Sequence, residues 1–350
     1  MKRKGNPITR KELTITSRSM RFSWGLFGFE ACLTVIFLIA IAVLGVENRY
    51  SYVRSNASRF SSFIAIFPAV SIAELCIVAL IIPVMTATLI SGEKERQTFD
   101  IMLTTQIKPM QIVVGKMMSS VIKVMTYVIM SIPIMAVGFT LGGISWWALL
   151  FFLVFTLLTA LLEASVGIFC SAACKRSITS ILLTYFIMGL IYMGTFLPIF
   201  ITALMDSFMT VFTGESLAMS GSMLALLPNP VVLFVEYFSL ALGGESYFVK
   251  EMVDEGLPIL SFMGEKCVWL IISSIVILLL SYLFLRLAAR AVDPLRGGRG
   301  QASKAKTAVN YTPVRQEESR QNIAGGYGQE ESRQNIAGTY GQEENRQYTE

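Results

Sequence analysis

The sequence has no histidine at all, and only 15% of its 350 residues are charged. Because imidazole is missing, histidine-ligated metal centres, haem ligation and histidine-based acid–base catalysis are excluded. The five cysteines lie in or beside apolar runs, so we interpret them as small buried hydrophobic residues, not as disulfides or metal ligands. Neither the phosphate-binding Gly-x4-Gly-Lys-Ser/Thr loop nor the Gly-x-Ser-x-Gly elbow of serine hydrolases occurs. We therefore expect no catalytic residue, no metal and no cofactor in this chain.

Apolar residues dominate instead, because 54% of the chain is hydrophobic before its 26 glycines are counted. Six runs each supply the ~20 apolar residues that a helix needs to cross the hydrocarbon core of a bilayer. The first run is too long for a signal-peptide core, so we expect it to remain as an anchor. The sequence thus predicts an all-α, polytopic membrane protein with about six transmembrane helices, at residues 24–46, 62–90, 111–141, 146–172, 178–205 and 267–287.

Positive charge alternates from loop to loop and indicates how the chain is oriented. The basic segments are the N-terminus, residues 91–116, Lys175 with Arg176, and residues 286–306. The long segment 206–266 is acidic and is expected to lie outside the cell. The loop between the first two spans disagrees with this orientation, because it is expected on the outer side but carries three arginines, Arg49, Arg54 and Arg59. The other loops predict a multi-pass protein of the plasma membrane with both termini in the cytosol.

The first 21 residues are strongly basic, and Asn6 followed by Pro7 is typical of a helix start. Ile8, Ile15 and Phe22 recur every seven residues and form a thin apolar stripe. This pattern predicts a short amphipathic helix in the cytosolic interface of the membrane, with its cations near anionic lipid. An unstructured basic leader is the alternative.

Two later segments are not expected to span the membrane. The apolar run at residues 231–242 is too short to cross and suits an interfacial or re-entrant helix; if it did cross, the C-terminus would lie outside. From residue 293 large apolar side chains become rare, and a 13-residue unit at 316–328 recurs at 329–341. We therefore expect a transmembrane domain over residues 1–292 and a disordered cytosolic tail over residues 293–350.

A polar stretch at residues 91–116 interrupts the apolar runs between the second and third spans. Ser91 is expected to cap a short helix, and Glu93 and Glu95 then lie in its first turn, where the helix dipole favours negative charge. Three apolar side chains follow at i, i+3, i+4 spacing and share one face: Phe99, Met102 and Leu103. A short helix gains little stability alone, so this face needs a surface to dock on: lipid, the chain's own helices or another protein.

The same stretch resembles the cytosolic loop of ABC-2 type permeases, the membrane subunits of ATP-driven exporters. The resemblance departs from the family pattern at Gln97, where the family usually has glycine, and in the order of the charged pair. It is carried by Glu95 with Arg96, Thr98, the run MLTT at residues 102–105, and Gly115 with Lys116 opening the next span. The start of the chain, residues 6–13, also resembles the start of many of these permeases.

The resemblance implies the membrane-spanning permease subunit of an ABC exporter, working as a dimer with a second permease copy or a paralogue. ATP would be bound and hydrolysed by a separate cytosolic ABC ATP-binding subunit, so the chain itself is not expected to be an enzyme. Membrane lipid is a further expected partner, and nucleic acid is not expected to bind. The transported substrate stays open and could be a lipid, a peptide, a drug or an ion. The short helix would transmit nucleotide-driven closure to the spans through contacts with the ATPase subunit at Glu93, Glu95, Arg96, Thr98, Phe99, Met102 and Leu103.

Four charged residues fall inside the expected spans: Glu30, Glu74, Lys123 and Glu163. Such residues are costly unless they are paired or hydrated, so they indicate either a polar path or proton relay, or structural ion pairs, which we favour. Counting along the spans places Lys123 ~18 Å, Glu163 ~14 Å and Glu74 ~24 Å from the cytosolic ends, so Glu163 is the expected partner of Lys123. A polar path would favour an ion-coupled secondary transporter instead, and a membrane scaffold without transport is a third alternative.

Overall fold

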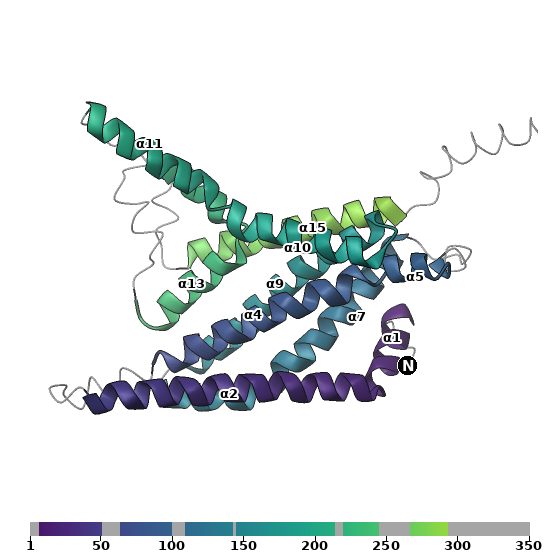
Figure 1. Ribbon diagram of the computed structural model, residues 1–350, viewed down its shortest axis with the longest axis horizontal. Coiled ribbons are helices and arrows are strands. Elements are labelled where there is room, and N and C mark those ends of the chain that lie inside the picture. The colour runs from purple at the N-terminus through teal and green to yellow at the C-terminus, as the bar shows by residue number, and fades with distance from the viewer. Residues whose placement is uncertain are drawn as a thin grey trace, which may run out of the picture. The chain divides into compact units, whose positions relative to one another are not determined.

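The computed structural model of the protein describes residues 7–50, 64–99, 109–142, 145–213, 220–244 and 267–292 (Figure 1). Helices account for nearly all of these residues, and none of them belongs to a β-strand. Within the described ranges, six helical segments are long and apolar enough to cross a membrane, which confirms the all-α, six-span prediction. These candidate spans are Met20–Val43, Ile66–Glu95, Pro109–Met130, Trp146–Ala173, Ser177–Val211 and Val268–Val292.

Two of the expected spans are interrupted next to a proline. The third divides at Ser131, ahead of Pro133, between α7 (Pro109–Met130) and α8 (Ile132–Gly142). The fifth divides ahead of Pro198, between α10 (Ser177–Gly194) and α11 (Leu197–Thr213). The helix α11 continues into the segment that was expected to lie outside.

The bounds of the described helices are as follows: α1 Pro7–Ser17, α2 Met20–Tyr50, α4 Ile66–Ala87, α5 Ser91–Glu95, α7 Pro109–Met130, α8 Ile132–Gly142, α9 Trp146–Ala173, α10 Ser177–Gly194, α11 Leu197–Thr213, α12 Ser220–Met223, a 3-10 turn Leu224–Leu226, α13 Pro230–Ala241 and α15 Val268–Val292.

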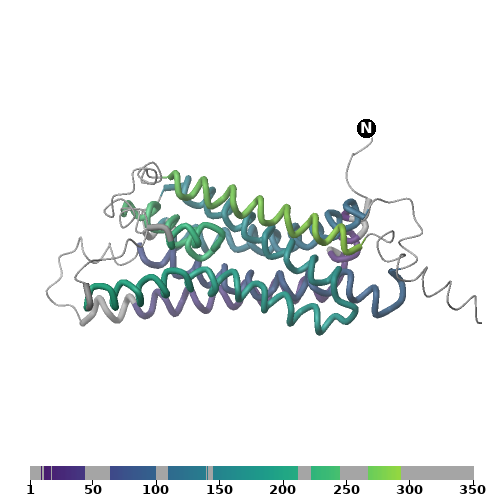
Figure 2. The backbone as a smooth tube through the Cα atoms, turned by 90° about the horizontal axis from the view of Figure 1, so that it is seen from above, coloured from purple at the N-terminus to yellow at the C-terminus, as the bar shows by residue number. Residues whose placement is uncertain are grey.

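The helix α9 is the centre of the packing, and it contacts α4, α7, α10, α13 and α15. Figure 2 shows the long helices running side by side. Close approach between α9 and α4 depends on Gly167, because a Cβ there would lie 2.8 Å from the Cβ of Thr86. No side chain fits in that space, which is how small residues bring membrane helices together. Large apolar side chains fill the remaining space in two clusters along α9, one around Phe152 and the other around Ile168.

The bundle has two ends, which we name after short helices. The helices α1 and α5, the start of α7 and the end of α15 lie at the α5 end, whereas α12 and α13 lie at the α13 end (Figure 1). The helices α8, α11, α12 and α13 contain no lysine or arginine. The α5 end carries basic residues on several helices and turns, among them Arg96, Lys116, Lys175, Arg176 and Arg290. Of the three dissenting arginines, Arg49 lies near the end of α2, and the other two are outside the described residues.

The N-terminal stretch forms a helix, as predicted, because α1 begins at Pro7 and ends at Ser17. It contacts α7 and α2. Ile15 is 63% exposed, whereas Phe22, at the start of α2, stacks on Tyr127 of α7 with ring centroids 5.2 Å apart. The side chain of Ile8, the first member of the predicted stripe, is not among those described.

The run expected to form an interfacial or re-entrant helix is α13, whose 12 residues span ~18 Å, well short of the ~30 Å of a bilayer core. Asn229 caps it, because its Oδ1 accepts from the N–H of Val231 at 2.9 Å, and Pro230 opens the helix. The Asn229 amide also donates to the carbonyl of Tyr192 and to Thr195 Oγ1, at 2.9 and 2.7 Å. These contacts attach α13 to the end of α10.

The chain divides into two units, Met1–Val292 and Asp293–Glu350. Every residue that the structure describes belongs to the first. The 13-residue repeats of the expected tail lie outside the described residues, as does most of the expected outer segment between α13 and α15.

Candidate functional site

The short helix α5 starts differently from the expectation. Ile90 occupies the N-cap position, and no side chain caps the helix. Ser91 is instead the first helical residue, and its hydroxyl donates to the carbonyl of Ala87 at 2.7 Å. The backbone therefore passes from α4 through one tight turn into α5, and the prediction that Ser91 caps the helix is wrong.

The end of α5 is a Schellman motif. The N–H of Thr98 donates to the carbonyl of Glu93 at 3.0 Å, and the N–H of Gln97 donates to the carbonyl of Lys94 at 3.2 Å. This motif requires a left-handed residue at its C′ position, and Gln97 has a φ of 57°. Glycine adopts that conformation most easily, so the glycine of the family pattern falls where the backbone needs it.

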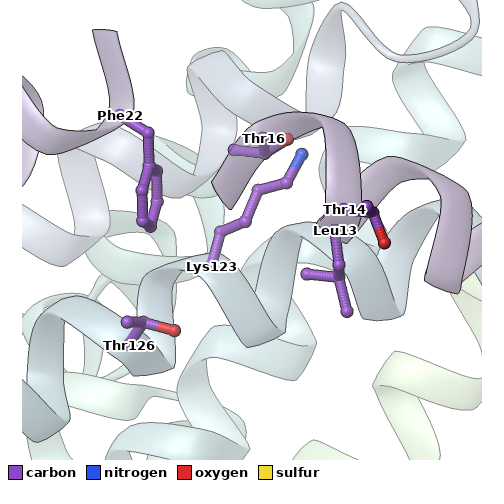
Figure 3. Close-up of a pocket in the computed structure, with 6 residues that line it drawn as sticks. All are labelled: Leu13, Thr14, Thr16, Phe22, Lys123 and Thr126. Carbon is purple, nitrogen blue, oxygen red and sulfur yellow. The ribbon is translucent and has the colours of Figure 1, made fainter. Parts of the chain in front are cut away.

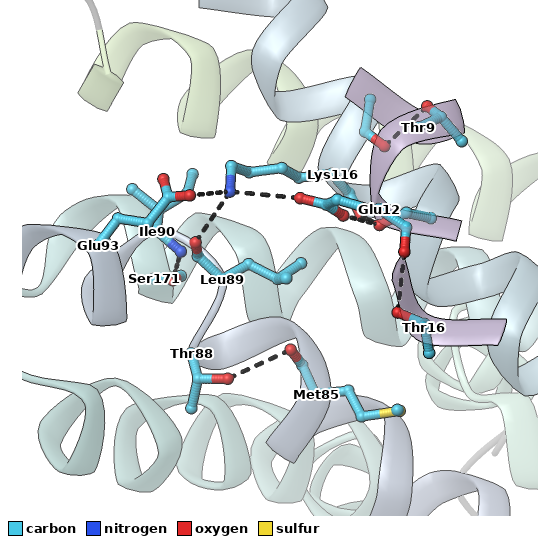
Figure 4. Close-up of polar contacts among 12 residues, drawn as sticks. Thr9, Glu12, Thr16, Met85, Thr88, Leu89, Ile90, Glu93, Lys116 and Ser171 are labelled. Atoms are coloured by element: carbon cyan, nitrogen blue, oxygen red, sulfur yellow. Dashed lines mark hydrogen bonds and ion pairs between the residues drawn. The ribbon is translucent and has the colours of Figure 1, made fainter. Parts of the chain in front are cut away.

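Lys116 of α7 holds a polar cluster between α5 and α1 (Figure 4). Its Nζ lies 2.7 Å from Glu93 Oε1 and 3.5 Å from Glu12 Oε1, and it donates to the carbonyl of Leu89 at 3.2 Å. Glu12 also accepts a hydrogen bond from Ser119. The Lys116 side chain is 4% exposed, so these ion pairs are less screened than pairs on an open surface.

Ser171 of α9 fixes the turn from the other side. Its Oγ accepts from the backbone N–H groups of Ile90 and Ser91, at 2.8 and 2.9 Å. All three residues are buried. Without this hydroxyl, two backbone donors would lie in the core without a partner, which is costly.

Two adjacent side chains of α5 reach the ends of two spans. The ammonium of Lys94 donates to the carbonyl of Ala172, in the last turn of α9, where the helix dipole is negative. The carboxylate of Glu95 accepts from the N–H and the hydroxyl of Ser177, at 2.9 and 2.7 Å, at the start of α10, where the dipole is positive. Each charge therefore lies at the helix end of opposite polarity.

Phe99 was expected to contact the ATPase subunit, with lipid or the chain's own helices as the alternative surface, and it is only 6% exposed in the isolated chain. It belongs to the hydrophobic cluster that contains Val113, Met117 and Ala172. Lys94 Nζ lies 5.6 Å from the centre of its ring. The chain's own helices thus cover Phe99, and it is not a free anchor. Met102 and Leu103, the other two apolar residues of the expected face, are outside the described residues.

The expected contact residues therefore separate into two groups. Glu93, Glu95 and Phe99 make contacts within the chain. Arg96 and Thr98 are exposed and form, with Gln97 between them, a turn directly after α5. We call residues 96–98 the α5 turn.

The charged residues inside the spans do not pair as expected. Within the described part of the chain, Lys123 and Glu163 make no ion pair, because Glu163 accepts a hydrogen bond from Tyr192 of α10 instead. Glu74 lies 2.7 Å from the hydroxyl of Ser131, at the break between α7 and α8. Glu30 of α2 is partly buried. Equal depth in the membrane does not bring two side chains together unless the helices also turn those sides toward each other, and the sides that carry Lys123 and Glu163 do not meet.

Several residues of this site were not assigned a role from the sequence: Glu12, Lys116, Ser171 and Ser177. Lys116 was noted only as part of a motif, although a lysine just inside an apolar span needs a counter-charge. The sequence could have indicated a role for Glu12, because it is the one acidic residue among the first 21 residues. Nothing in the sequence marks Ser171 or Ser177, because hydroxyl groups are common in these spans.

The comparisons with known proteins bear on the whole first unit. No curated protein matches the chain. The model of a family described as ABC-2 family transporter protein matches residues 8–289, from α1 to the last turns of α15. Since this match covers more than half of the chain, the protein belongs to the ABC-2 family of membrane transporter proteins.

Proposed function

We propose that this chain is the membrane-spanning permease subunit of an ATP-driven exporter. A separate cytosolic ABC ATP-binding subunit binds and hydrolyses ATP, and the permease works with a second copy or a paralogue in the plasma membrane. The observation that supports this role is the set of contacts made by α5. The five residues of α5 connect to α7 through Glu93, to α9 through Lys94, and to α10 through Glu95.

Such a helix can transmit a displacement because its contacts are short, polar and directed. A movement of α5 must carry the end of α9 and the start of α10 with it, or break both charge–dipole contacts. The buried ammonium of Lys116 extends the connection to α1. An ATP-bound partner that prefers one position of α5 thereby shifts the balance between two states of the bundle.

The α5 turn is our candidate contact for the ATPase subunit. Its side chains are exposed, it follows directly on α5, and Arg96 offers a guanidinium for a carboxylate on the partner. The expected cytosolic location of the α5 end rests on its basic residues, since short cytosolic loops are enriched in lysine and arginine. Both termini are cytosolic in this arrangement.

Site-specific photo-crosslinking tests the contact. A photo-reactive residue replacing Arg96 should crosslink, in native membranes, to a protein that carries a phosphate-binding Walker loop. The same residue replacing Trp147, which is 68% exposed at the start of α9, should not. Absence of such a crosslink from position 96, or equal crosslinking from both positions, would contradict the proposal and leave the ion-coupled or scaffold alternatives.

Coupling is tested separately from contact. Glu95→Gln removes the charge that lies at the start of α10 but leaves the α5 turn in place. We expect this variant to co-purify with the ATPase subunit at the wild-type level, while the permease-dependent part of ATP hydrolysis falls. Unchanged hydrolysis would show that the Glu95 contact does not transmit the signal.

A further inference from the structure

A cavity of about 260 Å³ lies between α1, the start of α2 and α7 (Figure 3). It is smaller than the roughly 300–1,000 Å³ of pockets that enclose drug-sized ligands, so it suits a compact group. Its walls combine apolar surface, hydroxyl groups and one ammonium. The lining residues are Leu13, Thr14, Thr16, Phe22, Lys123 and Thr126.

Lys123 supplies the only charge among these lining residues, and its side chain extends from α7 toward α1 (Figure 3). It is partly buried, and within the described residues its ammonium makes no hydrogen bond and no ion pair. The acidic residue of α1, Glu12, is already bound by Lys116 and Ser119. Glu12 attracts the ammonium of Lys123, but Lys116, which binds the same carboxylate, repels it. A partly desolvated cation whose only nearby counter-charge is shared with a second cation is unfavourable, so the cavity favours an anionic occupant.

The cavity lies level with the start of the candidate span Met20–Val43, because Phe22 of that span stacks on Tyr127 of α7. The ~18 Å counted along the sequence for Lys123 assumed that α7 enters the membrane near residue 111, whereas this stack places residues 123–127 beside the first turn of α2. Phe22 of its lining is among the first residues of the candidate span Met20–Val43. Trp24, two residues further on, is 68% exposed, as aromatic residues at the membrane–water interface are. Arg18, just before α2, and Arg21, in its first turn, are also exposed. A lipid headgroup can therefore reach Lys123 without leaving the leaflet.

The hydroxyl groups narrow the chemistry further. Thr16 Oγ1 donates to the carbonyl of Glu12 at 2.9 Å, and Thr126 Oγ1 donates to the carbonyl of Ile122 at 2.8 Å. With their protons engaged, these two oxygens present lone pairs to the cavity and act as acceptors. An occupant that fits carries negative charge for Lys123 and hydroxyl donors for the threonines.

We propose that this cavity binds the headgroup of an anionic, hydroxyl-bearing phospholipid such as phosphatidylglycerol, with the phosphate at Lys123. The headgroup hydroxyls donate to Thr16 and Thr126, and the acyl chains run along the apolar side of Phe22. The bound lipid then fills the gap between α1 and α7. This site is independent of the contacts that α5 makes with α9 and α10.

The test is a titration of purified full-length protein in non-ionic detergent with short-chain phosphatidylglycerol carrying a fluorescent acyl chain. Lys123→Gln should weaken binding about five- to tenfold, because one charge contact near the membrane surface is lost. Lys123→Arg keeps the charge and should restore binding. Arg290→Gln, at an exposed cation on α15, should bind as the wild type does.

A second variant keeps the test decisive if Lys123→Gln does not fold. Thr126→Leu keeps the ammonium but fills part of the cavity, and it breaks only a hydrogen bond within its own helix. It should also weaken binding about fivefold. Wild-type affinity in Thr126→Leu, or in a folded Lys123→Gln, would overturn the proposal.

Competition experiments with unlabelled compounds show whether the cavity binds a lipid headgroup or free phosphate, and whether the bound group must carry a net negative charge. Unlabelled phosphatidylglycerol should displace the probe, whereas phosphatidylcholine of equal chain length and inorganic phosphate at the same concentration should not. Displacement by inorganic phosphate would assign the site to free phosphate and overturn the lipid assignment. Equal displacement by phosphatidylcholine would show that the cavity does not select an anion, which also overturns it.

Discussion

Gln97 shows how much a single residue can disclose about local structure. The sequence marked it as a departure from a glycine of the family pattern, and the backbone there is left-handed, with a φ of 57°. A non-glycine residue in this conformation costs ~1–2 kcal/mol. The two hydrogen bonds of the Schellman motif hold it in place, through the carbonyls of Glu93 and Lys94.

We therefore expect Gln97→Gly to stabilise the isolated permease. Relief of the left-handed strain is partly offset by the greater flexibility of glycine in the unfolded chain, which leaves ~0.5–1 kcal/mol. The measurement is the midpoint of thermal unfolding in detergent. Arg96→Gly is the matched control, because Arg96 has a φ of −83° and gains no relief. A midpoint that falls in both variants would contradict the assignment of strain to residue 97.

The pairing of Lys116 lay beyond what the sequence could predict, and the reason is distance along the chain. Its partners Glu12 and Glu93 are 104 and 23 residues away, and only the packing of α1 and α5 on α7 brings them together. Hydropathy fixes neither the rotation of a helix nor its neighbour. The same limitation explains the wrong pairing of Lys123 with Glu163.

Removing the ammonium of Lys116 should destabilise the permease. Breaking a fully buried ion pair costs ~3–5 kcal/mol, but Glu12 and Glu93 are 22% and 31% exposed, so we expect ~1–3 kcal/mol for Lys116→Met. Adding Glu93→Gln should cost less than the sum of the two single changes, because the pair is already lost. Lys175→Met, at an exposed lysine, is the control. Strict additivity in unfolding midpoints would mean that Lys116 and Glu93 are not coupled.

At the scale of elements, the spans were predictable and the shortest helix was not. Long apolar runs must be helical in a bilayer, and the short apolar run at residues 231–242 predicted the helix α13. In contrast, α5 has five residues, too few to be stable by itself. The residues that α5 contacts determine its bounds. The sequence therefore predicted a short helix here but assigned its N-cap to Ser91, which is instead the first helical residue.

Phe99 tests which surface holds this element. Because Phe99 lies in the chain's own hydrophobic cluster, Phe99→Ala should lower the stability of the isolated permease by about 3 kcal/mol. Phe186→Ala, at a phenylalanine 69% exposed on α10, should change it little in detergent. Thermal unfolding of both variants without the ATPase subunit makes the comparison. Wild-type stability in Phe99→Ala would restore the alternative that the partner covers this side chain.

At the scale of the whole molecule, composition and hydropathy predicted the class and the number of spans, because both follow from the thickness of the bilayer. They did not predict that α9 lies at the centre, since that depends on small residues such as Gly167 opposite Thr86. The orientation of the bundle stays a prediction. It rests on the basic residues of the α5 end, and Arg49 in α2 counts against it.

Two native cysteines can decide that orientation. Cys267 is exposed just before α15, whose Trp269 packs with α12 and α13 residues at the α13 end, and Cys174 is partly exposed just after α9 at the α5 end. If the α5 end is cytosolic, an impermeant thiol reagent should label Cys267 on intact cells. Cys267→Ser should then abolish the labelling, and Cys174→Ser should leave it unchanged.

The remaining cysteines do not confuse this measurement. Cys32 and Cys76 lie within spans, where the bilayer excludes the reactive thiolate, and Cys170 is buried. Permeabilising the cells should add labelling that depends on Cys174, which serves as the positive control. If Cys174→Ser instead abolished labelling on intact cells, the α5 end would face outside. A cytosolic ATPase subunit could then not reach the α5 turn, and the proposed coupling would fall with the topology.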